Sequence, residues 1–186
     1  MQHEINKMSL TVDSLDLTFD DIYKKDYIPQ DYLDEIKKAN LLIIPTEHFR
    51  GMQEVVFPET TLDFYEYIKE NSNDDITADI AISDGKFLKI ELHSAVITVA
   101  TIIVQYVVLP IATGLISSFL YELVKKHHRK NEETSAEVNI IVEETKSKKT
   151  KKITYKGPIS GIKQTLDNIS DKLFDDEEDN TWLLLK

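Results

Sequence analysis

Residues 94–121 have the sequence SAVITVATIIVQYVVLPIATGLISSFLY, a stretch of 28 residues without a charged side chain. As a single α-helix this segment would be about 42 Å long, more than the ~30 Å needed to cross the hydrocarbon core of a bilayer. Its apolar residues lie on every side of such a helix, which is typical of a membrane span or of a helix in a large core. We therefore expect one long, fully hydrophobic helix around which the rest of the fold is arranged.

Three environments fit this helix: a bilayer, the core of an oligomer or the sheath of a partner protein, and the chain's own core. The residues expected to make the membrane or oligomer contacts are Val99, Ile103, Val104, Val107, Leu109, Pro110, Gly114 and Leu115. Pro110 predicts a kink because proline removes one helical hydrogen bond. β-Branched residues are frequent, so part of the segment also fits a strand.

The flanks of the segment bear on its location. A basic flank follows it, made of Lys125, Lys126, Arg129 and Lys130, and such a flank suits the anionic headgroups of a cytoplasmic leaflet. The sequence thus predicts a protein of the bacterial inner membrane, or a cytoplasmic protein associated with it. Against a span, residues 1–93 are acidic and begin without the pattern of a signal peptide, so a whole domain would have to cross the membrane.

Composition excludes some functional classes. The chain of 186 residues carries 22 Lys and Arg against 33 Asp and Glu, a formal charge of −11. Such a chain is not expected to bind nucleic acid, because phosphate contacts need a basic face. It has no cysteine, so disulfides, thiolate nucleophiles and zinc sites built on cysteine are excluded. No cofactor is predicted.

The chain before the apolar segment divides into two parts. Residues 1–39 predict strands from their alternation, followed by a short helix after Pro29. Residues 40–93 predict a β-α-β-β domain. It begins with a buried strand at 41–44 and continues with a helix capped by Thr60 or Thr61. Its last two strands, within residues 76–92, are expected to form a hairpin, with Ser83-Asp84-Gly85 as the turn.

From residue 94 onward, the sequence predicts three further parts. Residues 94–130 are the hydrophobic helix with its basic flank, and residues 136–174 predict a β-β-α module. Residues 175–186 combine an acidic run with an apolar hook, which is expected either to return to the body as a strand or to hold a partner. The hook consists of Trp182, Leu183, Leu184 and Leu185.

Few residues suggest catalysis. Asp79, Lys89 and Glu91 loosely resemble the acidic and lysine residues of metal-dependent nucleases, although the order Lys-Ile-Glu departs from that pattern. The sequence lacks a P-loop, a GxGxxG loop and a GxSxG elbow. A soluble, nuclease-like enzyme that binds a metal near the 76–92 hairpin is therefore the alternative to a non-enzymatic protein.

Short motifs along residues 40–170 give a resemblance to known sequences. The motifs, in order, are Ile43-Ile44-Pro45, Phe57-Pro58-Glu59, Leu92-His93-Ser94, Leu109-Pro110 and Tyr155-Lys156-Gly157. This order resembles that of a set of small uncharacterised bacterial proteins. The resemblance implies an accessory or membrane component of a conflict system, such as antiphage defence or a toxin system. It implies no catalytic residues.

The sequence as a whole predicts an α+β protein, with small antiparallel sheets and packed helices flanking one long hydrophobic helix. We expect it to act without catalysis, through that helix and through protein–protein contacts. The expected partners are other copies of the chain, a second protein of the same system and an anionic membrane surface.

Overall fold

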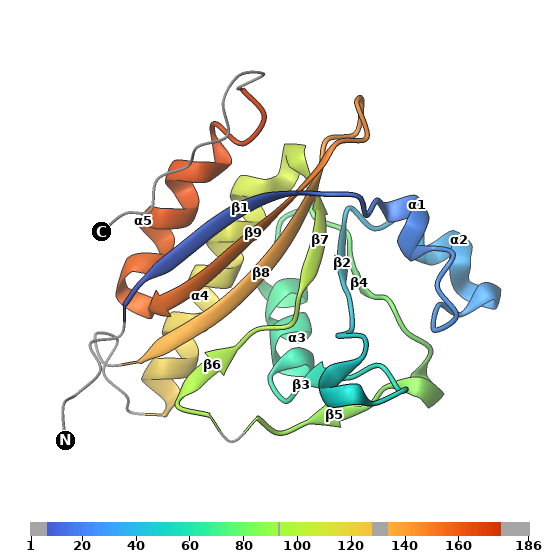
Figure 1. The fold of residues 1–186 in the computed structure, drawn as a ribbon, viewed down its shortest axis with the longest axis horizontal. Coiled ribbons are helices and arrows are strands. Elements are labelled where there is room, and N and C mark those ends of the chain that lie inside the picture. The colour runs from blue at the N-terminus through green and yellow to red at the C-terminus, as the bar shows by residue number, and fades with distance from the viewer. Residues whose placement is uncertain (1–6, 93, 128–133, 176–186) are drawn as a thin grey trace.

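The computed structural model describes residues 7–92, 94–127 and 134–175, and the fold is α+β. A seven-stranded sheet forms its centre, with strand order β1-β9-β8-β7-β2-β4 and β6 paired to β8 (Figure 1). The strands of this sheet are β1 (Ser9–Leu15), β2 (Leu41–Ile43), β4 (Ala78–Ile80), β6 (Val96–Thr98), β7 (Ile102–Gln105), β8 (Ser135–Glu143) and β9 (Thr150–Pro158). The α-helices are α1 (Phe19–Ile22), α2 (Leu33–Ile36), α3 (Thr61–Asn71), α4 (Leu109–Lys126) and α5 (Ile159–Ser170).

The sheet is mixed, which corrects the expectation of small antiparallel sheets. Strands β1, β9 and β8 are antiparallel neighbours, whereas β7 runs parallel to β8 and β2 runs parallel to β4. Each parallel pair is joined through a helix, β2 to β4 through α3 and β7 to β8 through α4, because parallel strands need a crossover connection. Strands from four of the segments distinguished above thus join one sheet.

The uncharged segment is not one helix over its whole length. Its first half forms β6 and β7, and its second half forms α4 after a short 3₁₀ turn, η4 (Tyr106–Val108). The first half is rich in β-branched residues, which suit a strand buried on both faces. Pro110 lies in the first turn of α4, where its missing N–H would be unpaired in any case, so the predicted mid-helix kink is wrong.

Helix α4 is the middle helix of a layer that covers one face of the sheet. It contacts α5 on one side, α3 on the other and strand β7 beneath (Figure 1). The ring of Phe119 lies 5.0 Å from Phe64 and 5.6 Å from Tyr67, both on α3. Neighbours on three sides explain why α4 is apolar nearly all the way round.

By length and composition alone, the helical stretch Tyr106–Lys126 would also suffice to cross a membrane. In an 18-residue part of this stretch, more than half of the residues, 56%, are buried inside the protein. The core helix of a water-soluble domain has this same character, and both that environment and association with a membrane are compatible with it.

The predicted 76–92 hairpin is wrong. Strand β4 pairs in parallel with β2, whereas β5 (Lys89–Ile90) pairs with β3 (Phe57–Pro58) in a separate two-stranded sheet. The expected turn residues form a 3₁₀ turn, η3 (Asp84–Lys86), and Gly85 does not take a left-handed conformation. Without a tight reversal, the chain carries β5 away from β4.

Other local predictions are confirmed. Strands β8 and β9 form a long antiparallel hairpin that leads directly into α5, as the alternating pattern and the spacing of apolar residues predicted. Strand β2 is wholly buried, and α3 begins at Thr61. The capping prediction is wrong in detail, because the Thr60 hydroxyl donates to the Thr98 carbonyl at 2.9 Å and caps no amide of α3.

Candidate interaction surface

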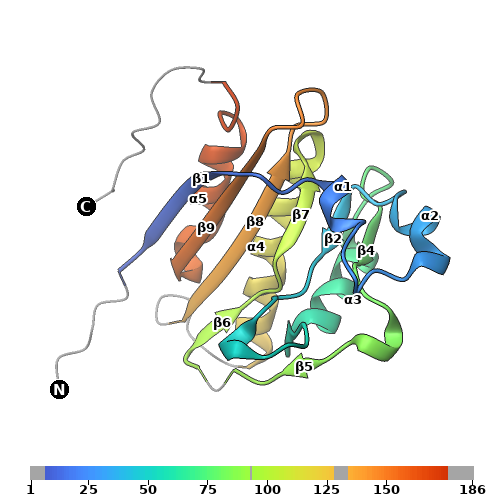
Figure 2. The same cartoon turned by 45° about the vertical axis from the view of Figure 1, so that its right-hand side comes forward.

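The face of the sheet opposite α3, α4 and α5, here called the front face, is divided into two halves. One row of cross-strand partners runs over six strands: Asp13, Lys152, Ile141, Ile103, Leu42 and Asp79. The three central residues, which are aliphatic, are buried, whereas Asp13 is exposed and Lys152 is half-buried. The middle of the front face is therefore sealed, and its β1–β9–β8 side is open to solvent (Figure 2).

The sealed half is covered by the chain that follows β1. Phe19 and Ile22 of α1, together with Tyr27 and Ile28, belong to the same apolar core as the central residues of the row. Helix α1 is short, but it begins with a capping box in which Thr18 and Asp21 bond reciprocally. The hydroxyl of Thr18 is the main cause of the lowered pKa of Asp21.

A buried carboxylate joins α1 to the sheet. Glu143, at the end of β8, accepts a hydrogen bond of 2.7 Å from the backbone N–H of Phe19 and one of 3.1 Å from the ammonium of Lys148. The hydrogen bond that Lys148 donates to Glu143 is also the main cause of the raised pKa of Lys148, whose ammonium lies 3.7 Å from Asp20. The turn between β8 and β9 thus holds the start of α1 over the sheet.

The open half carries a polar surface on three antiparallel strands. We define the front surface as Thr11 and Asp13 of β1, Asn139 of β8, and Lys152, Thr154 and Lys156 of β9. The hydroxyl of Thr154 donates to the Asn139 side chain at 3.0 Å, and Lys156 lies 3.8 Å from Glu137. On the front face, no described helix lies over β1 or β9 (Figure 2). Donors, acceptors and charges of both signs are therefore presented on one open part of the sheet.

The strands beneath the front surface are anchored on their other side. Tyr155, whose neighbours in β9 point forward, is wholly buried among the helices, and its hydroxyl donates to the Pro158 carbonyl at 2.5 Å. Burial raises the pKa of Tyr155 to about 12. Gly157 provides space for β1, because a Cβ there would lie 3.0 Å from the Cα of Met8. Side-chain anchoring and close strand packing hold this platform in shape.

The residues predicted for the apolar contact are distributed over three elements. Val99 follows β6, Ile103 and Val104 lie in β7, and all three are buried, as are Leu109 and Leu115 of α4. Gly114 is half-buried and Pro110 is exposed. Val107 in η4 is 77% exposed, so it is the large apolar residue of this set that faces outward.

The other predicted contact residues lie at the ends of the described ranges or outside those ranges. Lys125 and Lys126 are exposed in the last turn of α4, where their charge suits the helix dipole. Arg129 and Lys130 of the basic flank lie outside the described residues. The hook, Trp182, Leu183, Leu184 and Leu185, also lies outside them.

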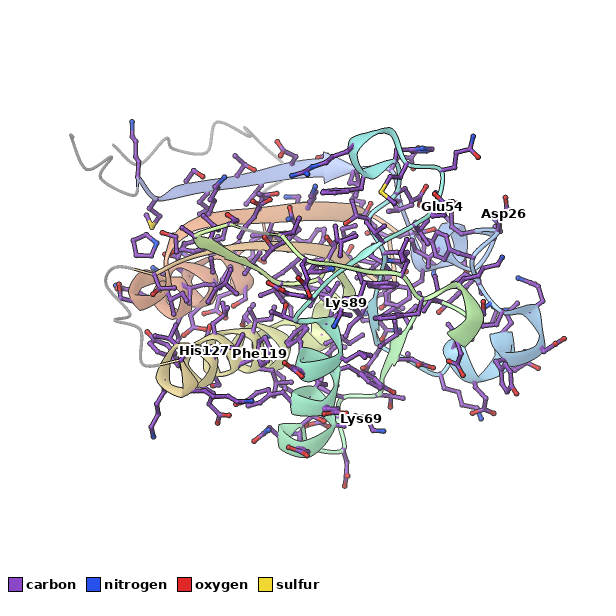
Figure 3. The ribbon with its side chains drawn as sticks, turned by 90° about the horizontal axis from the view of Figure 1, so that it is seen from below. Asp26, Glu54, Lys69, Lys89, Phe119 and His127 are labelled. Carbon is purple, nitrogen blue, oxygen red and sulfur yellow. The ribbon has the colours of Figure 1, made fainter. Side chains whose placement is uncertain are left out.

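Hollows in the described part of the chain also occur away from the front surface, and two of them are lined by charged side chains. One of about 350 Å³ is lined by Glu59 and Asp63 at the start of α3, by Lys89 and by His127 after α4 (Figure 3). Its charged side chains are exposed and join no buried polar network. The other, of about 870 Å³, contains an ion pair of 2.8 Å between Lys25 and Glu47.

The residues of the nuclease-like alternative are separated by the fold. Asp79 lies on β4 of the large sheet, whereas Lys89 lies on β5 of the small sheet, and Glu91 follows it. The carboxylate of Asp79 accepts from the neighbouring backbone N–H of Ile80 at 2.8 Å. Within the described ranges, no group of three or more His, Asp or Glu side chains is placed to hold a metal ion.

The front surface was not predicted from the sequence, although a signal for it exists. Polar Lys152, Thr154 and Lys156 alternate with buried Ile153 and Tyr155, which indicates a strand with one solvated face. The alternation does not say whether a helix covers that face. Comparisons of the chain with protein-family models, with curated proteins and with solved structures find no significant match.

Proposed function

We propose that this chain is a non-enzymatic accessory protein that binds another protein through the front surface. The observation that carries the proposal is the division of the front face, of which one half is sealed by α1 and the other half is left polar and open. The open half is made of long, regular strands on an anchored core. Residues on rigid elements hold a binding geometry better than residues on loops do.

The chemistry of the front surface favours a protein partner. Its two lysines are accompanied by Asp13 and by the ion-paired Glu137, so it lacks the excess of positive charge that a nucleic acid requires. It is an open strand face, whereas small-molecule sites are concave and mostly apolar. Threonine, asparagine and charged side chains of both signs can supply the direct hydrogen bonds that a typical protein interface contains.

The setting we propose is a bacterial defence or toxin system, on the resemblance of the short motifs to small bacterial proteins of that kind. In such a system, an accessory protein would bring a second component to its place of action. The front surface is the part of the described chain that we assign to this contact.

A site-specific crosslink tests the proposal. A photo-reactive amino acid at Thr154 should capture a partner in cells of the source organism, whereas the same group at Lys69 of α3, on the opposite side of the molecule, should not. The captured protein is then purified. Lys152→Glu combined with Lys156→Glu should weaken its binding more than tenfold, and Lys69→Glu should leave it unchanged. Equal capture from both positions, or binding insensitive to the double reversal, would refute the proposal.

Association with a membrane is a second candidate, supported by the length and apolar composition of Tyr106–Lys126. In this arrangement α4 would leave the position between α3 and α5 and enter lipid. Cell fractionation separates this candidate from the first, because a protein folded around α4 stays in the soluble fraction without detergent.

A further inference from the structure

Strand β1 is a long free edge of the sheet. It pairs along its whole length with β9, and no described strand pairs with its other side. The opposite edge, β4, has three residues, whereas β1 has seven. Proteins usually shorten, cover or interrupt such edges, because unpaired amides and carbonyls are a template for another strand.

The free edge is also accessible and regular. Figure 2 shows β1 as the outermost strand, with α5 behind the sheet. The strand, SLTVDSL, contains no proline, so none of its residues lacks an amide for a further strand. Its inward-facing apolar residues, Leu10 and Val12, are only half-buried although they point toward the helix layer.

We infer that β1 pairs with β1 of a second copy to form one continuous sheet. The two strands are antiparallel and are related by a two-fold axis that passes between the two copies of Thr11. A two-fold axis perpendicular to the sheet sets each residue opposite one on the same face, so residue 10 meets residue 12 of the other copy and residue 9 meets residue 13. The pattern of side chains in β1 matches itself in this register.

On the helix side, the pairing completes an apolar row. Within one chain Leu10 lies opposite Tyr155, and Val12 lies opposite Ile153. Across the axis, Leu10 of one copy meets Val12 of the other, so the row becomes tyrosine, leucine, valine and isoleucine without a break. Cross-strand pairs of this kind stabilise a sheet, and the half-exposed Leu10 and Val12 would become covered.

On the front face, the same register places charges favourably. Asp13 lies opposite Lys152 in its own chain and opposite Ser9 of the second copy, and Ser9 is itself paired with Lys156. Each Asp13 therefore has Lys152 of its own chain beside it and Lys156 of the second copy one strand beyond Ser9. At the axis, Thr11 meets Thr11 between two copies of Thr154, its partner in β9. A register centred on Asp13 would instead oppose two like charges, which destabilises a sheet.

This inference does not depend on the partner proposed for the front surface, although dimerisation would join two front surfaces into one. The two ideas fail separately, since one is measured by the mass of the purified protein alone and the other by capture of a different protein. A dimer that captures no other protein would refute the proposed function alone. A monomer that captures another protein would refute the dimer alone.

Light scattering on the purified full-length chain is the first test. The measured mass of the wild type should be about twice the monomer mass of 21.4 kDa. Thr11→Lys and Thr11→Glu should each have the mass of a monomer, because residue 11 meets itself across the axis. Residue 11 is exposed in one chain, so each variant should melt at the temperature of the wild type diluted to its monomeric state. An equimolar mixture of the two variants should restore the dimer, since opposite charges then face each other. A monomeric wild type, or variants that remain dimeric, would overturn the inference.

Cysteine crosslinking tests the register. The natural chain has no cysteine, so any disulfide reports only the introduced residue. Under mild oxidation, Thr11→Cys should form a crosslinked dimer, because opposed residues lie about 4.5–5.5 Å apart and a disulfide spans this distance. The matched control is Asp13→Cys, on the same face of the same strand. Its two copies lie about 13 Å apart along the strand direction and should not crosslink. Crosslinking of Asp13→Cys in place of Thr11→Cys would overturn the register.

Discussion

Two neighbouring rows of residues across the sheet differ by a single position along each strand. The row facing the helices is Val12, Ile153, Ile140, Ile102, Ile43 and Ile80. The row on the front face is Asp13, Lys152, Ile141, Ile103, Leu42 and Asp79. The first is aliphatic from edge to edge, whereas the second is aliphatic only at its three central positions.

The difference follows from what covers each row. Helices α3, α4 and α5 extend across the back of the sheet, so every strand there contributes an apolar residue. On the front, α1 and the chain that follows it cover only the middle, and the residues beside them remain polar. Strands β7 and β2 are thus apolar on both faces, while β1 and β9 have one dry and one wet face. Substitutions on the two rows should therefore differ in their effect on stability.

The buried centre of the front row should not accept a charge. Ile103 has no exposed surface, and Ile103→Arg would bury a cation without a partner, so we expect a loss of more than about 4 kcal/mol or failure to fold. The matched variant Asp13→Arg lies in the same row but on the open half. It replaces an exposed opposite-charge pair with Lys152 by a like-charge pair, and should cost no more than about 1–2 kcal/mol in the monomer. Urea unfolding measures both. Equal effects would show that the two halves do not differ.

Along the helix-side row, the cost of truncation should fall from the centre to the edge. Ile140→Ala removes buried methylene and methyl groups and leaves a cavity, so it should cost about 2–5 kcal/mol. Val12→Ala, at the half-buried edge, should cost less than about 1 kcal/mol in the monomer, because the lost group was partly in water. Unfolding is best measured at protein concentrations at which the chain is monomeric.

The seal over the front face should depend on Glu143. Glu143→Ala leaves the buried amide of Phe19 without its acceptor and should cost about 1–3 kcal/mol. Hydrogen exchange of residues 19–28 should increase, while that of β9 should not. Glu143→Gln retains an oxygen acceptor and is the matched control. If Glu143→Ala leaves exchange at α1 unchanged, the carboxylate does not hold this helix on the sheet.

Alkaline pH should lower the free energy of unfolding through Tyr155, which lies on the helix side of the sheet. Its pKa is raised to about 12 in the folded protein, so the folded state holds the phenol proton more tightly than the unfolded chain does. The resulting stability is complete below pH ~10 and is lost as pH rises through about 12. Tyr155→Phe should cost about 1 kcal/mol at neutral pH, since it removes the hydrogen bond to Pro158, and should reduce the alkaline loss. An identical pH profile for the variant would contradict this assignment.

The smallest effect is expected at Val107, which lies four residues after Ile103 in the same uncharged segment. It is 77% exposed, so Val107→Arg should leave the melting temperature and the soluble fraction unchanged. A membrane span over residues 94–121, in which Val107 is central, would respond differently, because an arginine at the centre of a span costs about 2.5–3.5 kcal/mol and should release the protein from the membrane pellet. Fractionation of wild type and variant side by side distinguishes the two environments.

The local patterns that predicted correctly are those in which neighbours in sequence are also neighbours in the fold. The alternation in β8 and β9 and the apolar stripe of α5 lie in one hairpin followed by one helix, so their periods could be recognised directly. The front surface could be predicted only in part. Thr11 and Asp13 are 130 or more residues from the β9 residues beside them, and nothing local specifies that pairing.

The sequence by itself determined that much of the uncharged segment is buried, that residues 136–174 contain a hairpin and a helix, and that the chain is α+β. Only the tertiary structure decided which parts of the uncharged segment are strand and which are helix. A short apolar run satisfies either conformation until its neighbours are known. Pairing of β7 with both β2 and β8 makes β7 a central strand, and the place between α3 and α5 allows α4 to be apolar on nearly every side. These contacts join residues far apart in the chain, and for that reason no local pattern specified them.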